Sequence, residues 1–214
     1  RAPAQRRLIT VRFHAQLPAT ARVPDPLVVV KVPGSPVAAQ LVSLFPGSRL
    51  VFLLRDGRVV VDSWLAAYRA GSWALDEGAF PVTDGGREAL VRWQSAVWAF
   101  RTEVVQRAYD AHPSDRRVTI RYEDLVADPC AELTRLCVVL PLDAPIDRLA
   151  AVADEHAYEA VPPSDKGERK EIRSASPGGW RQNLTSAEHD VMHEVMGVQL
   201  AEHGYLDPQP APTA

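Results

Sequence analysis

The chain has 214 residues, of which 46% are hydrophobic and 24% are charged. This balance is typical of a soluble globular domain, and it excludes a disordered or low-complexity chain. Because the net charge at pH 7 is −3, no basic field covers the molecule. Neither nucleic acid nor a membrane is therefore expected as a partner.

The first predicted elements are a strand, a helix and a second strand. Residues 27–32 (LVVVKV) form a short β-branched run, typical of a strand buried on both faces. Ser35 and Pro36 supply an N-cap and a proline at the first helical position, which predicts a helix over 35–45. Residues 49–54 (RLVFLL) predict a second buried strand, which runs directly into an Arg-Asp-Gly-Arg turn.

The middle of the chain continues the alternation of helices and strands. A helix follows the turn and ends at Gly71, and residues 86–110 form the longest predicted helix. The expected apolar stripe of that helix consists of Leu90, Trp93, Val97, Phe100 and Val104. A third strand over 117–122 is followed by a helix to about Leu140 and by another over 146–158.

The last part combines a long loop with a well-marked helix. Residues 160–184 are polar and rich in glycine and proline, which predicts a long loop of the kind that is often functional. Thr185 and Glu188 have the spacing of a capping box, so a final helix is expected from there to Gly204. The two cysteines lie seven residues apart on one predicted helix, too far for a disulfide. A cytoplasmic protein is expected.

Strands separated by helices predict parallel βαβ units. The expected fold is therefore α/β, a three-layer sandwich with helices on both sides of a central, mostly parallel sheet. Ligands of such folds bind at the carboxyl ends of the strands. Lys31, Arg55 and Tyr122 each lie at or close to the end of a predicted strand, so we expect them at one rim, where they would form a binding site.

The segment FPGSRLVFLLRDGRVVVDSW (45–64) carries the strongest signal. Arg55 leaves a strand where the next helix begins, and backbone N–H groups and the helix dipole favour an anion there. Ser63 lies within that helix beside its apolar face, so its hydroxyl needs a partner. Two interpretations are open. Either Arg55 pairs with a carboxylate and Ser63 bonds back to its helix, or both hold an anionic ligand.

This segment resembles the 3′-phosphate-binding strand–turn–helix of the sulfotransferases that use 3′-phosphoadenylyl sulfate (PAPS). RYEDLVADPCAEL resembles the family's tyrosine-bearing strand and following helix, while GGWRQNLT and HGYLDP resemble its nucleotide-covering loop and last helix. The resemblance implies the P-loop-NTPase-like α/β fold of that family and a set of nucleotide-binding residues. Those residues are Arg55, Ser63, Tyr122, Arg173, Gly179 and Trp180.

The arrangement most resembles the tyrosylprotein sulfotransferase branch and its bacterial relatives. In that branch a strand-end lysine and a serine of the C-terminal loop stabilise the transferring sulfonate, and these roles fall on Lys31 and Ser164 by position. A cation and a hydroxyl donor suit the oxygens on which charge accumulates as the S–O bond breaks. A metal is not expected, because fixed cations take its place.

The sequence departs from the family pattern at two nucleotide-binding positions. The second arginine of the branch's 3′-phosphate site falls on Ala67, with Arg69 nearby as a substitute. The lysine before the loop tryptophan falls on Gly179, and Arg173 or Arg181 is its candidate replacement.

The N-terminal region lacks a further family feature. No Ser/Gly/Thr-rich 5′-phosphosulfate loop precedes residue 27, and the acidic base that follows this loop in the tyrosylprotein branch is missing too. We interpret residues 1–214 as a single sulfotransferase domain without that segment. The sequence does not identify the residue that acts as general base. His14 fits a surface histidine better, and Glu123 fits a helix cap better.

The resemblance implies an enzyme that transfers the sulfuryl group from PAPS to a hydroxyl acceptor and releases adenosine 3′,5′-bisphosphate (PAP). The alternative is a non-catalytic nucleotide-binding or interaction module of the same fold. The acceptor stays open among a peptide tyrosine, a sugar and a small metabolite, because variable loops build such pockets. The oligomeric state is open as well, a homodimer included.

Overall fold

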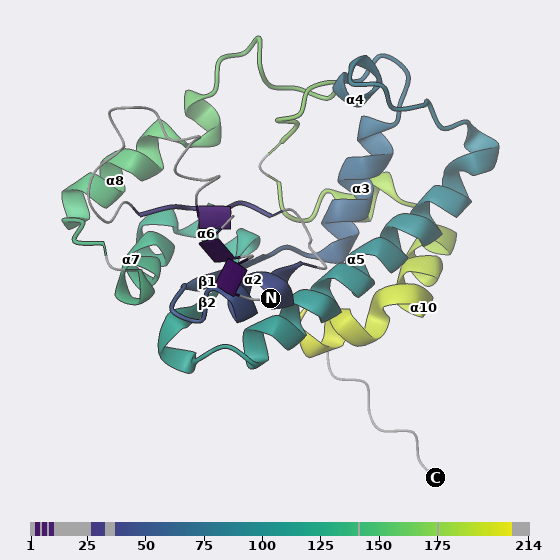
Figure 1. Ribbon diagram of the computed structural model, residues 1–214. Coiled ribbons are helices and arrows are strands. Elements are labelled where there is room, and N and C mark those ends of the chain that lie inside the picture. Colours follow the sequence, from purple (N-terminus) through teal and green to yellow (C-terminus); the bar gives the residue numbers. More distant parts are fainter. Residues whose placement is uncertain are drawn as a thin grey trace.

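The computed structural model describes residues 3–4, 6–7, 9–10, 27–32, 37–140, 142–174 and 176–206. Helices surround a small parallel sheet (Figure 1). The strands are β1 (Leu50–Leu54) and β2 (Arg117–Arg121). The helices are α2 (Ala38–Leu44), α3 (Gly57–Ala67), α4 (Trp73–Asp76), α5 (Arg87–Asp110), α6 (Tyr122–Ala127), α7 (Pro129–Val139), α8 (Ile146–Glu155), α9 (Trp180–Asn183) and α10 (Ser186–Glu202). Short 3₁₀ turns are η2 (Asp84–Gly86), η3 (Ser114–Arg116) and η4 (Tyr158–Ala160).

The strands of the described part pair in parallel, with Leu50 opposite Arg117 and Leu54 opposite Arg121. The chain between them forms α3, α4 and α5, a long crossover of the kind that parallel pairing requires. Figure 1 shows α5 and α10 on one side of the strands and α7 and α8 on the other. The predicted α/β architecture with a parallel sheet is confirmed, with one strand pair among the described residues.

The main core lies between β1 and the helices α3, α5 and α10. Phe52 and Leu54 of β1 are buried in it, whereas the alternate residues Val51 and Leu53 are 38% and 59% exposed. The other large core residues are Val59, Val61, Leu65, Val91, Trp98, Met192, Met196 and Leu200. Each fully buried side chain of this size stabilises the fold by about 1.5–3 kcal/mol relative to its exposed state.

The prediction of a strand over residues 27–32 is wrong. These residues have no regular secondary structure and all six are exposed, Val29 by 82%. The prediction equated a β-branched apolar run with a buried strand. A strand also needs a neighbour that satisfies its backbone groups, and local composition does not supply one. The helix predicted after it is present as α2, while the expected cap at Ser35 and Pro36 lies outside the described residues.

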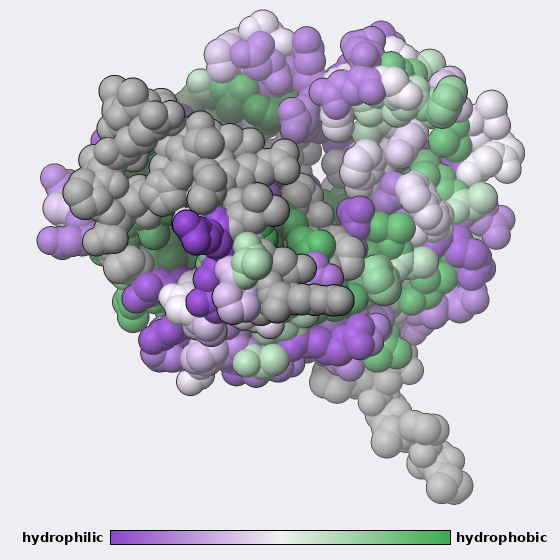
Figure 2. Space-filling model, viewed as in Figure 1, coloured by the Kyte–Doolittle hydropathy of each residue, from purple (hydrophilic) through white to green (hydrophobic). Residues whose placement is uncertain are grey.

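The packing face of α5 differs from the predicted apolar stripe. Trp93 and Phe100 are 56% and 54% exposed, although both belong to the expected stripe. The buried positions of the helix are Leu90, Val91, Gln94, Ser95, Trp98, Ala99, Thr102 and Ala108. In Figure 2 hydrophobic residues (green) accordingly appear among polar ones on the right of the molecule, where α5 runs in Figure 1. The helical period was predicted correctly, but its phase was wrong because small polar residues occupy the core side.

The last helix agrees with the sequence, whereas α3 ends at Ala67, before the predicted Gly71, and the short helices α4 and α9 were not predicted. In the capping box of α10, Thr185 Oγ1 accepts the backbone N–H of Glu188, and the Glu188 carboxylate accepts the backbone N–H of Thr185 at 2.8 Å. Both cysteines lie on α7 and are unpaired. Across the described ranges, no helix has the length and apolar character that crossing a bilayer would require.

Candidate functional site

The turn after β1 is built by the four residues of the Arg-Asp-Gly-Arg motif. Asp56 caps α3, because its Oδ1 accepts the backbone N–H of Arg58 at 2.9 Å, and the two side chains form an ion pair at 2.7 Å. Gly57 is required by close packing. A Cβ atom there would lie 2.7 Å from the Met196 sulfur and from the Trp98 ring. The motif therefore begins α3 and lets it pack closely against α5 and α10.

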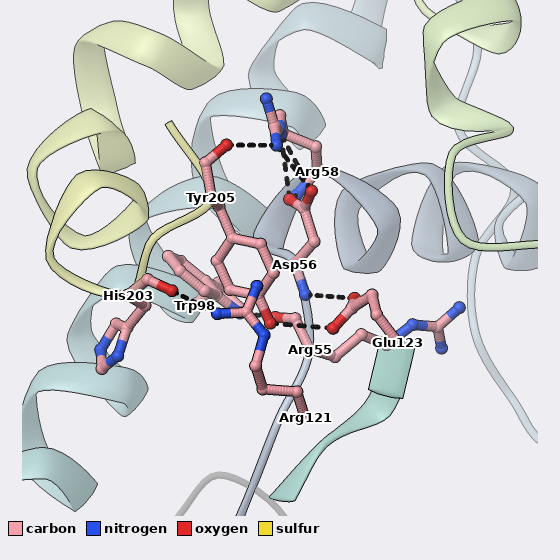
Figure 3. Close-up of polar contacts among 8 residues, drawn as sticks. All are labelled: Arg55, Asp56, Arg58, Trp98, Arg121, Glu123, His203 and Tyr205. Carbon is pink, nitrogen blue, oxygen red and sulfur yellow. Dashed lines mark hydrogen bonds and ion pairs between the residues drawn. The ribbon is translucent and has the colours of Figure 1, made fainter. Parts of the chain in front are cut away.

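Among the residues that the structure describes, none forms a hydrogen bond or ion pair with the side chain of Arg55. Its guanidinium stacks on the ring of Tyr122, with the carbon 4.2 Å from the ring centroid. Its Nε is buried without a hydrogen bond, and within the described ranges no carboxylate pairs with it. Figure 3 shows the guanidinium directed away from the polar contacts around Asp56. The first interpretation of the sequence, a carboxylate on Arg55, is therefore wrong for the described part of the chain.

Ser63 is likewise without a hydrogen-bond partner in the described part of the chain. It lies on α3 and is half-buried, and its hydroxyl forms no hydrogen bond with any residue that the structure describes. Ser95 on α5 shows the alternative, because its hydroxyl donates to the Val91 carbonyl one turn earlier at 2.7 Å. The strand–turn–helix thus carries two donors, Arg55 and Ser63, whose hydrogen-bonding capacity is unused.

The register of the sheet explains why Arg55 meets Tyr122. Leu54 ends β1 opposite Arg121, which ends β2, so the next residue of each strand lies beside the other. The expectation that Arg55 and Tyr122 share a rim is confirmed. It does not extend to Lys31, whose predicted strand is not formed and which is exposed.

Glu123 fixes the turn that carries Arg55. Its Oε1 accepts the backbone N–H of Asp56 at 2.9 Å, and its Oε2 accepts the hydroxyl of Tyr205 at 3.0 Å. Burial, reinforced by the Glu123 carboxylate, raises the pKa of Tyr205 above its ordinary range. We expected Glu123 to cap the helix after β2, and this is wrong, because α6 has no side-chain cap. Glu123 instead accepts a backbone N–H of the turn that follows β1.

The end of α10 is joined to the same turn (Figure 3). Arg58 Nη2 donates to the Tyr205 carbonyl at 2.9 Å, and Arg121 Nη1 donates to the His203 carbonyl at 2.6 Å. The Arg121 guanidinium also stacks on the Tyr205 ring at 4.1 Å. The indole N–H of Trp98 donates to the Arg55 carbonyl at 3.1 Å. Contacts from several elements thus fix the backbone around Arg55, while its side chain forms no hydrogen bond with a described residue.

The C-terminal loop reaches α3 through Arg173. The Arg173 guanidinium forms an ion pair with Asp62, whose carboxylate also accepts Asn183 Nδ2 at 3.2 Å. Sequence reasoning missed Asp62 and Asn183. The available signal was a lone carboxylate within the apolar run VVVDSW, where an acidic side chain requires a buried partner.

Trp180 does not lie in a loop as predicted. It begins α9 and is only 6% exposed, and its ring contacts Arg58, Arg181 and His189. No open face remains on which an adenine ring could stack. The expected nucleotide contact at Trp180 is therefore replaced by a core position.

Among the described residues, neither Gly179 nor Ser164 takes part in the contacts described for Arg55. Gly179 is the N-cap of α9 with φ of −58°. Ser164 is exposed, and its hydroxyl donates to Asp165 Oδ1 at 3.0 Å. His14, named as a candidate base, lies outside the described residues.

A model of the sulfotransferase family matches residues 3–145, well over half of the chain. The chain belongs to the sulfotransferase family. The match contains Arg55, Ser63 and Tyr122, whereas the loop with Arg173 and Trp180 lies beyond it.

The fold agrees with that of another sulfotransferase. The chain is similar to the crystal structure of mouse sulfotransferase SULT7A1 complexed with PAP, with 15% sequence identity and a TM-score of 0.55. The match covers 77% of this chain and 65% of that chain, so this chain spans somewhat less than two thirds of its neighbour's length. At this identity the likeness shows a shared fold. A comparison with curated proteins gives no match.

Proposed function

We propose that this sulfotransferase binds PAPS with the nucleotide 3′-phosphate at Arg55 and Ser63, and transfers the sulfuryl group to a hydroxyl acceptor. The observation that carries the proposal is the unpartnered, buried Nε of Arg55. A buried guanidinium donor without a partner is costly, and an anionic ligand would remove that cost. Arginine also suits phosphate, because its planar fork donates two parallel hydrogen bonds.

The electrostatics of the turn support an anion at Arg55. Two carboxylates that hold this turn, those of Asp56 and Glu123, are already engaged. Asp56 pairs with Arg58, and Glu123 accepts a backbone N–H and a tyrosine hydroxyl. The N-terminus of α3 contributes its positive dipole end at the same turn. A phosphate here would meet uncommitted donors.

Tyr122 and the C-terminal loop complete the proposed nucleotide site. The Tyr122 ring supports the Arg55 guanidinium by stacking and limits the directions in which it can point. Arg173 and Gly179 belong to the loop that we propose covers the nucleotide. Trp180 contributes by anchoring α9 in the core.

The proposed reaction breaks the bond between the sulfuryl sulfur and the phosphate oxygen of PAPS. A new S–O bond forms to the acceptor hydroxyl, whose proton passes to a base, and PAP leaves. Lys31 and Ser164 are proposed to donate to the sulfuryl oxygens. Lys31 is exposed and forms no hydrogen bond or ion pair with another described residue, while Ser164 bonds to Asp165. The base, the acceptor, the tyrosylprotein branch and the cytoplasmic location stay predictions from sequence.

Calorimetric titration of the full chain with PAP, with AMP as the control ligand, tests the nucleotide site. The 3′-phosphate distinguishes the two ligands, so we expect tighter binding of PAP. Arg55→Ala should weaken PAP binding by about tenfold to a hundredfold, since a hydrogen bond to a charged group is worth about 1.5–3 kcal/mol. Ser63→Ala should weaken it less. Arg92→Ala, which removes an exposed ion pair with Glu194, is the matched control. Equal affinities for PAP and AMP would contradict the site.

Turnover separates an enzyme from a non-catalytic nucleotide-binding module. Transfer of labelled sulfuryl from PAPS to phenolic, sugar and alcohol acceptors would establish the enzyme. Lys31→Ala should then lower the transfer rate while PAP affinity changes little, because its proposed contact is with the sulfuryl group. PAP binding without transfer to any acceptor would favour the module.

A further inference from the structure

Asp62 is a buried carboxylate in the helix that carries Ser63. Its side chain is 4% exposed, and the flanking residues of the helix, Val61 and Leu65 among them, belong to the core. A carboxylate in such surroundings is costly unless hydrogen-bond donors surround it. Its partners therefore reveal what the residue does.

Both partners of Asp62 come from the C-terminal loop region. Arg173 reaches it across 111 residues of sequence, and Asn183 reaches it across 121. These two residues flank the Pro-Gly-Gly turn of 177–179, where Gly178 has a φ of +155°. Asp62 thus fastens the chain on both sides of that turn to α3. The Tyr158 hydroxyl adds a bond to the Arg173 carbonyl at 3.0 Å.

Arg173 keeps most of its hydrogen-bonding capacity after this pairing. A guanidinium has five N–H donors, and only Nη2 contacts Asp62. The side chain is 21% exposed, and among the described residues no acceptor is bound by its other N–H groups. An arginine held by a buried carboxylate at one nitrogen has a fixed orientation for the others, which lowers the entropy lost on binding.

We propose that Asp62 is a positioning residue for the nucleotide: it fastens Arg173 and the loop to α3 and aims the free N–H groups of Arg173 at the 3′-phosphate. This inference rests on the proposed function, because it takes PAP and PAPS as the ligands. It assigns to Asp62 an action through Arg173, without contact to the reacting atoms. The charge of Asp62 is compensated by Arg173, so it does not repel the phosphate as a free carboxylate would.

A mutant cycle on the full chain tests the proposal. The variants are Asp62→Asn, Arg173→Gln and their combination, and the combined variant leaves no unpaired charge at the buried site. We expect Asp62→Asn to weaken PAP binding about tenfold, with AMP binding unchanged. In the Arg173→Gln background, Asp62→Asn should have no further effect on PAP binding. Arg92→Gln, which breaks the exposed pair with Glu194, should change neither affinity.

Hydrogen exchange gives a second readout that does not depend on nucleotide. Asp62→Asn should speed amide exchange over 168–183 and leave α5 and α10 unchanged. Unchanged exchange in the loop would overturn the fastening role. Equal losses of PAP and AMP affinity, or an effect that persists in the Arg173→Gln background, would overturn the positioning role. A native chain that does not prefer PAP to AMP would overturn the proposed function itself, and the role of Asp62 would fall with it.

Discussion

The Glu123 carboxylate accepts the backbone N–H of Asp56 at 2.9 Å and so joins the turns that follow the two strands, 67 residues apart in sequence. Its second oxygen receives the Tyr205 hydroxyl. One side chain therefore holds the β1 turn, the start of α6 and the end of α10 together. Arg55, which lies between Leu54 and Asp56, depends on this contact for its position.

Replacing Glu123 should affect both stability and nucleotide binding. Glu123→Ala leaves the Asp56 N–H and the Tyr205 hydroxyl without their acceptor, so we expect a loss of about 1–3 kcal/mol in the free energy of unfolding. Glu123→Gln retains one acceptor oxygen and should lose less. Urea unfolding and PAP titration of both variants measure these effects. An alanine variant as stable as the glutamine variant would show that the contact does not hold the turn.

The raised pKa of Tyr205 predicts a loss of stability in alkali. Burial and the neighbouring Glu123 disfavour the phenolate in the folded chain, whereas the unfolded chain ionises near the ordinary tyrosine pKa of about 10. The contribution is therefore complete below about pH 10 and falls as the pH rises beyond it. The free energy of unfolding, measured in urea from pH 8 to pH 11, should decline more steeply for the native chain than for Tyr205→Phe. Parallel curves for the two proteins would contradict this account.

Gly57 is predicted to tolerate no side chain. A Cβ atom would lie 2.7 Å from both the Met196 sulfur and the Trp98 ring, so Gly57→Ala must displace α3 from its neighbours. We expect a cost of about 1–3 kcal/mol, the usual range for overpacking a core. Gly85→Ala is the matched control, because nothing lies within 4 Å of the added carbon there. Thermal unfolding of the two variants compares them, and equal midpoints would refute the packing argument.

The two tryptophans of α5 should differ sharply in importance. Trp98 is 7% exposed and Trp93 is 56% exposed. Trp98→Ala should therefore cost about 3–5 kcal/mol, while Trp93→Ala should stay within about 0.5 kcal/mol of the native chain. Urea unfolding of each variant tests this order. If Trp93→Ala were the more costly change, the buried face of α5 would be the apolar stripe expected from the sequence.

The sequence predicted what short-range patterns determine. The Arg-Asp-Gly-Arg turn, the position of Tyr122 after a strand and the capping box at Thr185 each depend on a few neighbouring residues, and each is present. The parallel register then brought Arg55 to Tyr122 as expected.

The features that the sequence did not predict depend on distant partners. Periodicity gave the length of α5, but the helices packed against it decide which side is buried, and these lie far along the chain. The residues 27–32 have strand composition without a strand to pair with. Asp62 meets Arg173 across 111 residues, which no local pattern encodes. Polar residues on buried faces were therefore the main source of error.

The hydrogen bond from Arg58 to the Tyr205 carbonyl spans 147 residues of sequence. It connects the turn after β1 with the end of α10. A ribosome releases the β1 turn long before Tyr205 has been synthesised, so the turn emerges without its final support. We therefore expect Arg55 to reach its native position only after α10 has docked. Contacts of such long sequence separation form late and slow the folding of a domain. The proposed anion site is therefore expected to be among the last parts of the molecule to form, and nascent chains that stop before Tyr205 should lack it.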